Sequence, residues 1–382
     1  MNDDKKIKKV FTEEPEKELW KALLKYSYKS NIERYFYENN IPFNASATNS
    51  QLDNLSNSIA GALLQANEYY KASKEVSLQV EPLLLYYGTT NLLFALFVLT
   101  TGSIPRINNH GMHIHIDDKH KYIADTILIF DHPSDGGIHK FAKGLGASVD
   151  LCKCSNWTLK DFFDSIAEIK DDFEICYQDR QSKVIPLNVV NTPDGIVEKI
   201  YVKDEEVHSL VSNIEGFASA YLVPQKGHSR NEDNYYVLHH KMNGSDIQLA
   251  SYSGQPYLQV AHKSNSQLIT ISKELNMYIS LFALGSICRY HPERWNPFVT
   301  QDSTGEKLLI EKLLYYSRRI LPNIVLDRIT NNQVLFVSDK YVPESRIHLV
   351  GEHEVKEIVS NEVRKQFKQE HVDSIFDRSK LR

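Results

Sequence analysis

The sequence predicts an α+β protein in which helices from both ends of the chain form one core around a strand-rich middle section. Apolar residues recur at helical spacing over 13–40 and 47–73, and residues 82–105 contain no Asp, Glu, Lys or Arg. From about 106 to 262 the pattern changes to short β-type runs separated by turn residues. We therefore expect a predominantly helical core formed by the N- and C-terminal helices.

Length and charge limit the class of protein. The 382 residues fit two domains or one large core with insertions, and 24% charged residues is typical of a soluble globular protein. A net charge of −5 argues against broad electrostatic binding to nucleic acid, although a local basic patch is compatible with it. The N-terminal segment is charged and lacks an apolar leader, and Cys152 and Cys154 have no second close pair that would complete a zinc site. We therefore expect a cytoplasmic protein with reduced thiols.

The first two helices are predicted from their apolar spacing. Residues 13–40 form an amphipathic pattern that Pro42 ends. In the next segment one stripe of apolar residues continues the helical period, and it consists of Leu52, Leu55, Ile59, Leu63, Ala66 and Tyr70.

The uncharged segment 82–105 is long enough to span a membrane, since about 20 residues cross the hydrocarbon layer. However, "YYGTTN" (86–91) places polar groups near its middle, where each would need a partner in lipid. We therefore predict a soluble helix buried on all sides, which begins at Pro82 and ends near Gly102.

Shorter elements follow. "HGMHIHIDD" (110–118) and "YIADTILIF" (122–130) predict strands, and Thr158 is the expected N-cap of a helix over 158–173. Further predicted elements are short strands within 183–262, helices over 273–291 and 305–328, and an appended amphipathic helix over 351–382.

These elements suggest three parts of the chain. We expect an N-terminal helical extension over 1–46 and a core over 47–330 that carries a strand-rich insertion at about 106–262. A C-terminal strand and the appended helix occupy 331–382.

Two blocks of sequence resemble a known family. "QANEYYKAS" (65–73), "VEPLLLYYGTTNLLFAL" (80–96) and "NNHGM" (108–112) resemble the N-terminal signature of the YaaC-like proteins. "SLFALGSICRYHPERWNPF" (280–298) resembles their C-terminal signature, built on Arg-Tyr-x-Pro-x-x-Trp. The resemblance implies a shared fold and a bacterial cytosolic setting, and it does not indicate a mechanism. It carries over Tyr69, Tyr70, Pro82, Tyr86, Tyr87, Asn91, His110, Gly111, Arg289, Tyr290, Pro292 and Trp295.

The pair most suited to catalysis is His110 with Arg289. A histidine can act as acid or base near neutral pH, and a guanidinium can bind phosphate in a planar, multidentate way. Arg318 and Arg319 could line the same site for a nucleotide or RNA backbone. Two alternatives need no substrate: His110 could bond a carbonyl in a turn, and Arg289 in the last turn of its helix is favoured by the helix dipole. The spacing of Arg289 and His291 does not match the Arg-x4–6-His motif of helical ribonucleases.

A set of polar groups inside the predicted core could bind a ligand. Tyr70, Tyr86, Tyr87 and Asn91 place polar tips in a largely apolar bundle, where an unpaired group costs about 1–3 kcal/mol. They could satisfy one another, or they could line a pocket for a flat or hydroxyl-bearing ligand.

A weaker candidate is a metal site at His113, His115 and Asp117. On a strand these three side chains would point to one face, and two imidazoles with a carboxylate could bind Zn²⁺ or Fe²⁺. A solvated strand face explains the same alternation, so we expect no cofactor.

Three functions are compatible with these features. We rank first a binding or assembly protein that associates with itself or with a partner protein, with no membrane role. An enzyme directed at a nucleotide or RNA through His110 and Arg289 is the alternative, and a metal-dependent hydrolase is the weakest. A place in a multi-protein system such as phage defence is compatible with all three.

Overall fold

The computed structural model confirms an α+β fold with a helical core and several small sheets. The structure describes residues 6–41, 49–117, 119–132, 136–145, 151, 157–192, 195–227, 235–241, 244, 247–264 and 267–337. Cys152, Cys154 and the predicted helix over 351–382 lie outside these residues, and the three-part division of the chain stays a prediction.

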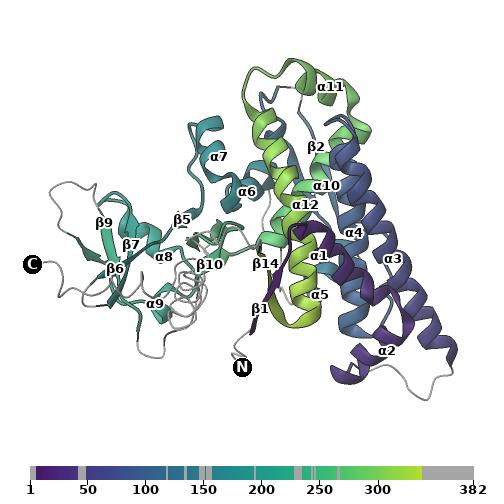
Figure 1. Ribbon diagram of the computed structural model, residues 1–382. Coiled ribbons are helices and arrows are strands. Elements are labelled where there is room, and N and C mark those ends of the chain that lie inside the picture. The colour runs from purple at the N-terminus through teal and green to yellow at the C-terminus, as the bar shows by residue number, and fades with distance from the viewer. Residues whose placement is uncertain are drawn as a thin grey trace, which may run out of the picture.

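Long helices from both halves of the chain form the helical lobe (Figure 1). Its four main helices are α3 (Asn49–Glu75), α4 (Glu81–Thr101), α10 (Lys273–Tyr290) and α12 (Glu306–Thr330). They pack with α1 (Pro15–Leu24) and α5 (Gly137–Gly144) around one continuous apolar core. The predicted stripe of the second helix faces this core, with Leu55, Ile59 and Leu63 buried. Residues that are distant in sequence therefore meet in one bundle, as the apolar pattern predicts.

Helix α4 is the helix of the uncharged segment. By length and composition it could cross a membrane, but 61% of its most apolar stretch is buried inside the protein. It contacts α3, α10 and α12, and it ends at Gly102, whose φ of 62° lies in the left-handed region that glycine accepts readily. At Gly88 an added Cβ would meet the Tyr70 ring at 2.7 Å, so this glycine permits the close approach of α3. These features fit the central helix of a soluble core.

The N-terminal segment differs from the single predicted helix over 13–40. A 3-10 turn over Lys25–Ser27 separates α1 from α2 (Lys29–Glu38). The Ser27 hydroxyl donates to the carbonyl of Leu24, and the Asn31 amide donates to that of Lys25, so side chains take carbonyls that a continuous helix would use.

A strand in the N-terminal segment was not predicted. Strand β1 (Lys6–Phe11) pairs in parallel with β14 (Asn332–Val337), and Lys6 lies opposite Asn332. Lysines occupy three of its six positions, so the sequence shows little apolar alternation. Pairing with β14, which the local sequence does not indicate, is what makes this segment a strand.

The helix predicted over 158–173 is also divided. Thr158 is its N-cap as predicted, in a capping box with Asp161. However, α6 (Leu159–Phe163) ends near Asp164, whose carbonyl accepts hydrogen bonds from Ser182 and from the backbone N–H of Lys183. A 3-10 turn and α7 (Lys170–Cys176) follow. The tertiary contact therefore replaces the helical hydrogen bond.

The middle of the chain forms small antiparallel sheets. One lies beside the helical core, in the order β2 (Met112–His115), β3 (Ile127–Phe130), β4 (Trp157–Thr158). A second has the order β6 (Asn188–Thr192), β7 (Gly195–Tyr201), β9 (Tyr235–Leu238), β8 (Gln225–Lys226). A third has the order β10 (Leu249–Ala250), β11 (Pro256–Gln259), β5 (Val184–Pro186). The strands β12 (His262–Ser264) and β13 (Gln267–Ile269) pair with each other, and α11 (Pro292–Gln301) follows α10.

The second and third sheets, with the short helices α8 (Val207–Ser212) and α9 (Phe217–Ala220), form the strand lobe. The two helices were not predicted. The strand lobe has a small apolar core of its own, which includes Leu187, Ile200 and Leu258. In Figure 1 it lies to the left of the helical lobe.

Candidate functional site

A pocket of about 360 Å³ opens where the first half of α4, the end of α10 and the start of β2 meet. Most of its surface is apolar or aromatic, and a few polar groups lie at its rim, as in most small-molecule sites. Its lining consists of Leu83, Tyr86, Tyr87, His110, Met112, His113, Ile114, Phe282, Gly285, Ser286, Arg289, Tyr290 and His291. The structure thus places His110 and Arg289 in one pocket.

The turn that presents His110 is held by the backbone. Gly111 has a φ of 75°, and a Cβ there would meet the Cα of Gly136 at 2.6 Å, so the position requires glycine. Its N–H donates to the Asn109 side chain, and the carbonyl of His110 accepts the N–H of Ile138. The backbone around the imidazole is therefore fixed by contacts on both sides.

The side chain of His110 is oriented by aromatic neighbours. Its Nδ1 lies 2.6 Å from the hydroxyl of Tyr86, and its ring centroid lies 5.5 Å from that of Phe282. Burial raises the pKa of Tyr86 well above its ordinary value, so this phenol keeps its proton. When Tyr86 donates to Nδ1, His110 carries its own proton on Nε2; the other tautomer would leave Nε2 as a base.

The charge state of His110 is set by its surroundings. Partial burial of the imidazole, and then the positive charge of Arg289, lower the pKa of His110 below its ordinary value. The ring is therefore neutral at pH 7, and a bound anion would shift it toward the protonated form.

Arg289 is held at the rim of the pocket by tyrosines. It donates to the hydroxyl of Tyr87, and its guanidinium lies 4.9 Å from the ring centroid of Tyr290. Its side chain is exposed, and among the described residues no carboxylate forms an ion pair with it. The last-turn position favours a cation through the helix dipole, but it does not neutralise the charge.

The other residues predicted to bind a ligand lie elsewhere. The hydroxyl of Tyr70 is fully buried 2.8 Å from that of Thr89, and Asn91 donates to the carbonyl of Tyr87 in its own helix. Arg318 pairs with Glu81, and Arg319 donates to Tyr252 on the strand-lobe side of α12. The structure therefore brings Tyr86 and Tyr87 to the pocket, but not the other four.

The predicted metal ligands His113, His115 and Asp117 do not form a cluster that could hold a metal ion. His113 lies 3.4 Å from a carboxylate oxygen of Asp131, His115 is exposed, and Asp117 accepts the N–H of Lys119. In the part of the chain that the structure describes, one cluster has three potential ligands close enough for a metal: Asp161, Asp164 and His262. Arg180 donates to both of its carboxylates at 2.6 Å, so a guanidinium already compensates their charge.

Sequence reasoning identified Arg289 but missed Phe282 and Gly285, which α10 also supplies to the pocket. Phe282, Gly285 and Arg289 follow one another at spacings of three and four, so they share one helix face. Phe282 and Gly285 lie within an uncharged run of this helix, where the sequence does not distinguish a pocket-facing residue from a core residue. An added Cβ at Gly285 would touch Tyr86 and Leu83 at about 3.4 Å, so this glycine lets α10 approach α4 beneath the pocket.

Comparison with known proteins gives one match. A family model described as "YaaC-like Protein" matches residues 18–329, which is most of the chain and includes much of the N-terminal segment that the signature blocks leave out. No curated protein matches, and no solved structure matches.

Proposed function

The chain belongs to the YaaC-like family, and from this premise we propose that it is a cytoplasmic binding protein whose pocket at His110 and Arg289 holds a phosphate-bearing ligand, a nucleotide or a segment of RNA. The observation that carries the proposal is the guanidinium of Arg289, which lies exposed at the rim of an aromatic pocket without an ion-pair partner among the described residues.

The chemistry of the rim suits a phosphate. A guanidinium presents parallel N–H groups that match two phosphate oxygens, and Tyr87 holds one end of Arg289 in place. With Tyr86 as hydrogen-bond donor to Nδ1, the Nε2–H of His110 would supply a further donor. The exposed ring of Tyr290 offers a surface on which a base can stack.

Binding is tested by calorimetric titration of the full chain with AMP and by fluorescence anisotropy with a labelled single-stranded RNA. Arg289→Gln should weaken binding by about 10- to 100-fold, because a charged hydrogen bond is worth about 1.5–3 kcal/mol. Arg34→Gln, which changes an exposed arginine paired with Glu38, is the matched control. Affinity that is the same in both variants would contradict the proposal, and the preferred probe distinguishes nucleotide from RNA.

The pH dependence of binding follows from the lowered pKa of His110. A phosphate bound beside it favours the imidazolium, so His110 should increase the affinity as the pH falls from 7.5 toward 5.5. The phosphate of AMP also takes up a proton at about pH 6, and comparison with His110→Gln separates the two effects. In this variant the contribution of His110 should be absent while Arg289-dependent binding remains. An unchanged pH profile in the variant would remove His110 from the site.

An enzymatic role of the same pocket stays a prediction. If His110 acts as acid or base, AMP-containing or RNA substrates should be converted by the wild type and not by His110→Gln, although the variant still binds. The metal-dependent hydrolase stays the weakest alternative, and elemental analysis of purified protein for stoichiometric zinc or iron tests it.

Assembly is the second candidate function, because large apolar side chains are exposed on neighbouring helices. Ile175 on α7 is 73% exposed, and Leu308 and Tyr315 on α12 are 64% and 57% exposed. The last two are seven positions apart, so they share one face of α12, and an ion pair between Lys312 and Asp172 joins that face to α7. Such a surface is suited to a second copy or a partner protein, in a multi-protein system such as phage defence.

Light scattering over a range of concentrations tests assembly. The wild type should show a mass above that of the monomer, and Leu308→Glu should reduce it, whereas Glu38→Lys, at an exposed position on α2, should not. A monomer at every concentration would rule out self-association and leave a partner protein as the remaining form of this function.

A further inference from the structure

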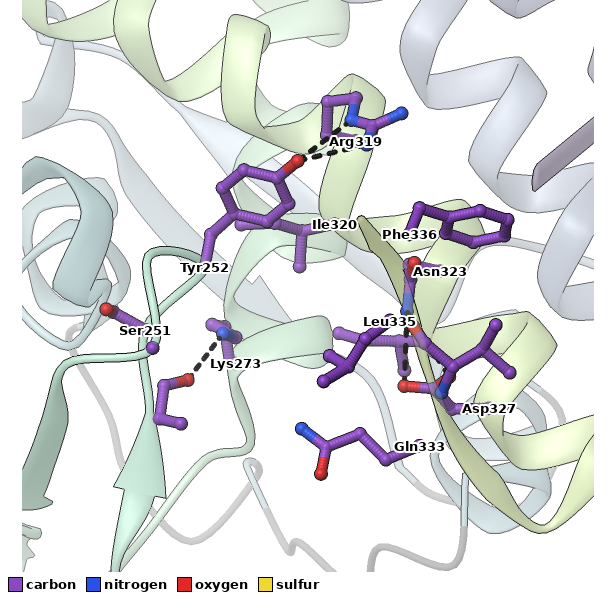
Figure 2. A pocket seen from close by; sticks show the side chains of 14 residues that line it. Ser251, Tyr252, Lys273, Arg319, Ile320, Asn323, Asp327, Gln333, Leu335 and Phe336 are labelled. Carbon is purple, nitrogen blue, oxygen red and sulfur yellow. Dashed lines mark hydrogen bonds between the residues drawn. The ribbon is translucent and has the colours of Figure 1, made fainter. Parts of the chain in front are cut away.

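A second site lies in the cleft between the two lobes. Two adjoining cavities, of about 200 and about 630 Å³, share Ala250, Lys273, Ile324, Asp327 and Gln333. Helix α12 and strand β14 form one wall, and the chain around β10 with the start of α10 forms the other (Figure 2). We call this the interlobe cleft, and it does not include any residue of the His110–Arg289 pocket.

Arg319 is a cation of the interlobe cleft that forms no ion pair among the described residues, unlike Lys273 and Arg328. Its Nε and Nη2 donate to the hydroxyl of Tyr252 at 3.1 and 3.0 Å, which Figure 2 shows as dashed lines. Its Nη1 is buried and has no hydrogen-bond partner among the described residues. A buried guanidinium N–H without an acceptor is costly, so this side chain is arranged for an acceptor that the described residues do not supply.

The carboxylates near Arg319 are engaged by other groups. Asp327 accepts the amide of Asn323 and the backbone N–H of Val334, and Glu274 pairs with Arg328. Glu168 is almost fully buried; its Oε1 accepts Lys273 at 3.2 Å and the N–H of Tyr252, whereas its Oε2 has no partner among the described residues. The positive charge of Arg319 is therefore not offset by an ion pair with any described carboxylate.

Neutral hydrogen-bonding groups extend along the same cleft. The hydroxyls of Thr270 and Ser272 line it, and each is buried without a partner among the described residues. The amide of Gln333 projects into the opening in Figure 2. Ile320 and Ile324 supply apolar surface between these polar groups. The arrangement suits a small molecule with one anionic group and several oxygen atoms.

We propose that the interlobe cleft binds a small hydroxylated organic oxyanion, with its carboxylate or phosphate group on Arg319 and its oxygen atoms on Gln333, Ser272 and Thr270. Carboxylate and phosphate share the chemistry that a guanidinium recognises, so the choice between them is left to the experiment.

The test is calorimetric titration of the full chain, at constant ionic strength, with citrate and with glucose 6-phosphate, and with inorganic phosphate as the smallest probe. At least one probe should bind saturably, and the preferred probe identifies the anionic group. Arg319→Gln should weaken this binding by about 10- to 100-fold. Arg34→Gln should leave it within about twofold, because its charge lies on an exposed surface pair.

Two more variants separate binding from folding. Tyr252→Phe removes the hydrogen bonds to Arg319 but keeps its charge, so binding should persist. Gln333→Ala removes an amide with no described hydrogen bond, so it should weaken binding without changing the melting temperature. If Arg319→Gln fails to fold, this variant tests the proposal in its place. Absence of saturable binding to all three probes overturns the proposal.

The two sites are distinguished by Arg289→Gln. If this variant abolishes binding of the preferred probe and Arg319→Gln does not, the anion occupies the His110–Arg289 pocket and the interlobe proposal is overturned. If Arg319→Gln alone abolishes it, the interlobe cleft is supported whatever the outcome for AMP or RNA.

Discussion

The helical lobe and the strand lobe bury their apolar side chains in different ways. In the helical lobe, helices of 18 to 27 residues from both halves of the chain share one continuous core. In the strand lobe, strands of two to seven residues enclose a small core that is separate from the first. A long helix spreads each contact over several turns, whereas a short strand depends on few neighbours. We therefore expect the helical lobe to contribute most of the stability and to fix most of the binding geometry.

The region between the lobes is polar. Arg180 joins Asp161 and Asp164, and His262 lies 3.6 Å from Asp164 at the beginning of β12. The carbonyl of Asp164 accepts the N–H of Lys183, which leads into the strand lobe. Ionic and hydrogen-bond contacts therefore join two apolar bodies, and the following predictions test how independent those bodies are.

The largest expected effect comes from matched truncations, Leu284→Ala in α10 and Leu258→Ala in β11. Both side chains are fully buried, and such deletions cost about 2–5 kcal/mol. Leu284→Ala should lower the free energy of unfolding of the whole helical lobe in urea titration. Leu258→Ala should increase hydrogen exchange in the strand lobe while α4 keeps its protection. Equal loss of protection in both lobes would show that they unfold as one unit.

A somewhat smaller effect is expected at Glu306, a buried carboxylate within the helical lobe. It accepts the N–H groups of Ile123 and Ala124 at 2.7 and 2.8 Å and the hydroxyl of Tyr177 at 2.6 Å. Glu306→Ala leaves three donors unpaired and should cost about 2–4 kcal/mol in urea titration. The control Glu311→Ala, on the exposed face of α12, should stay within about 0.5 kcal/mol. A comparable loss of unfolding free energy in both variants would mean that the buried hydrogen bonds of Glu306 do not contribute to stability.

The smallest effect is a pH dependence at the junction of the lobes. Burial raises the pKa of Asp164 to about 7, so its contribution to stability falls as the pH rises from about 4 to about 7. Burial lowers the pKa of His262 to about 3, so its contribution rises between about 3 and about 6.5. The two trends oppose each other over most of this window.

Asp164→Asn should remove the first trend and leave the second. The variant should therefore gain stability relative to the wild type as the pH rises from about 4 to about 6.5, by at most about 1.4 kcal/mol per pH unit. Chemical unfolding at several pH values measures the slope. Parallel pH profiles of the two proteins would show that Asp164 does not take up a proton on folding.

Elements that depend on local signals and elements that depend on distant contacts differ in how far they could be predicted from sequence. The uncharged segment after Glu81 predicts the buried helix α4, and Pro82 and Gly102 mark its ends, because these signals are local. Strand β1 was missed, because its partner β14 lies at the opposite end of the described chain. The break after α6 was missed because Asp164 bonds to residues almost twenty positions later. Contacts that are distant in sequence leave little trace in local periodicity.

The candidate site shows the same limit. The hypothesis of a His110–Arg289 site requires the two side chains to converge, and the structure places both in one pocket. Arg318 and Arg319 were grouped with Arg289 on charge alone, but Glu81 and Tyr252 hold them at other places. Charge identifies a residue that can bind phosphate, and only the tertiary partners show which residues are already occupied.

The pairing of β1 with β14 has a consequence for synthesis of the protein. Strand β1 is translated first among the described elements and its partner, Asn332–Val337, last. At about 5–20 residues per second, β1 waits on the order of tens of seconds for its partner strand. Helices α3 and α4 likewise emerge long before α10 and α12 can cover them. The nascent chain therefore exposes its most apolar helix for much of translation, which makes chaperone protection at that stage an expected need of the cell.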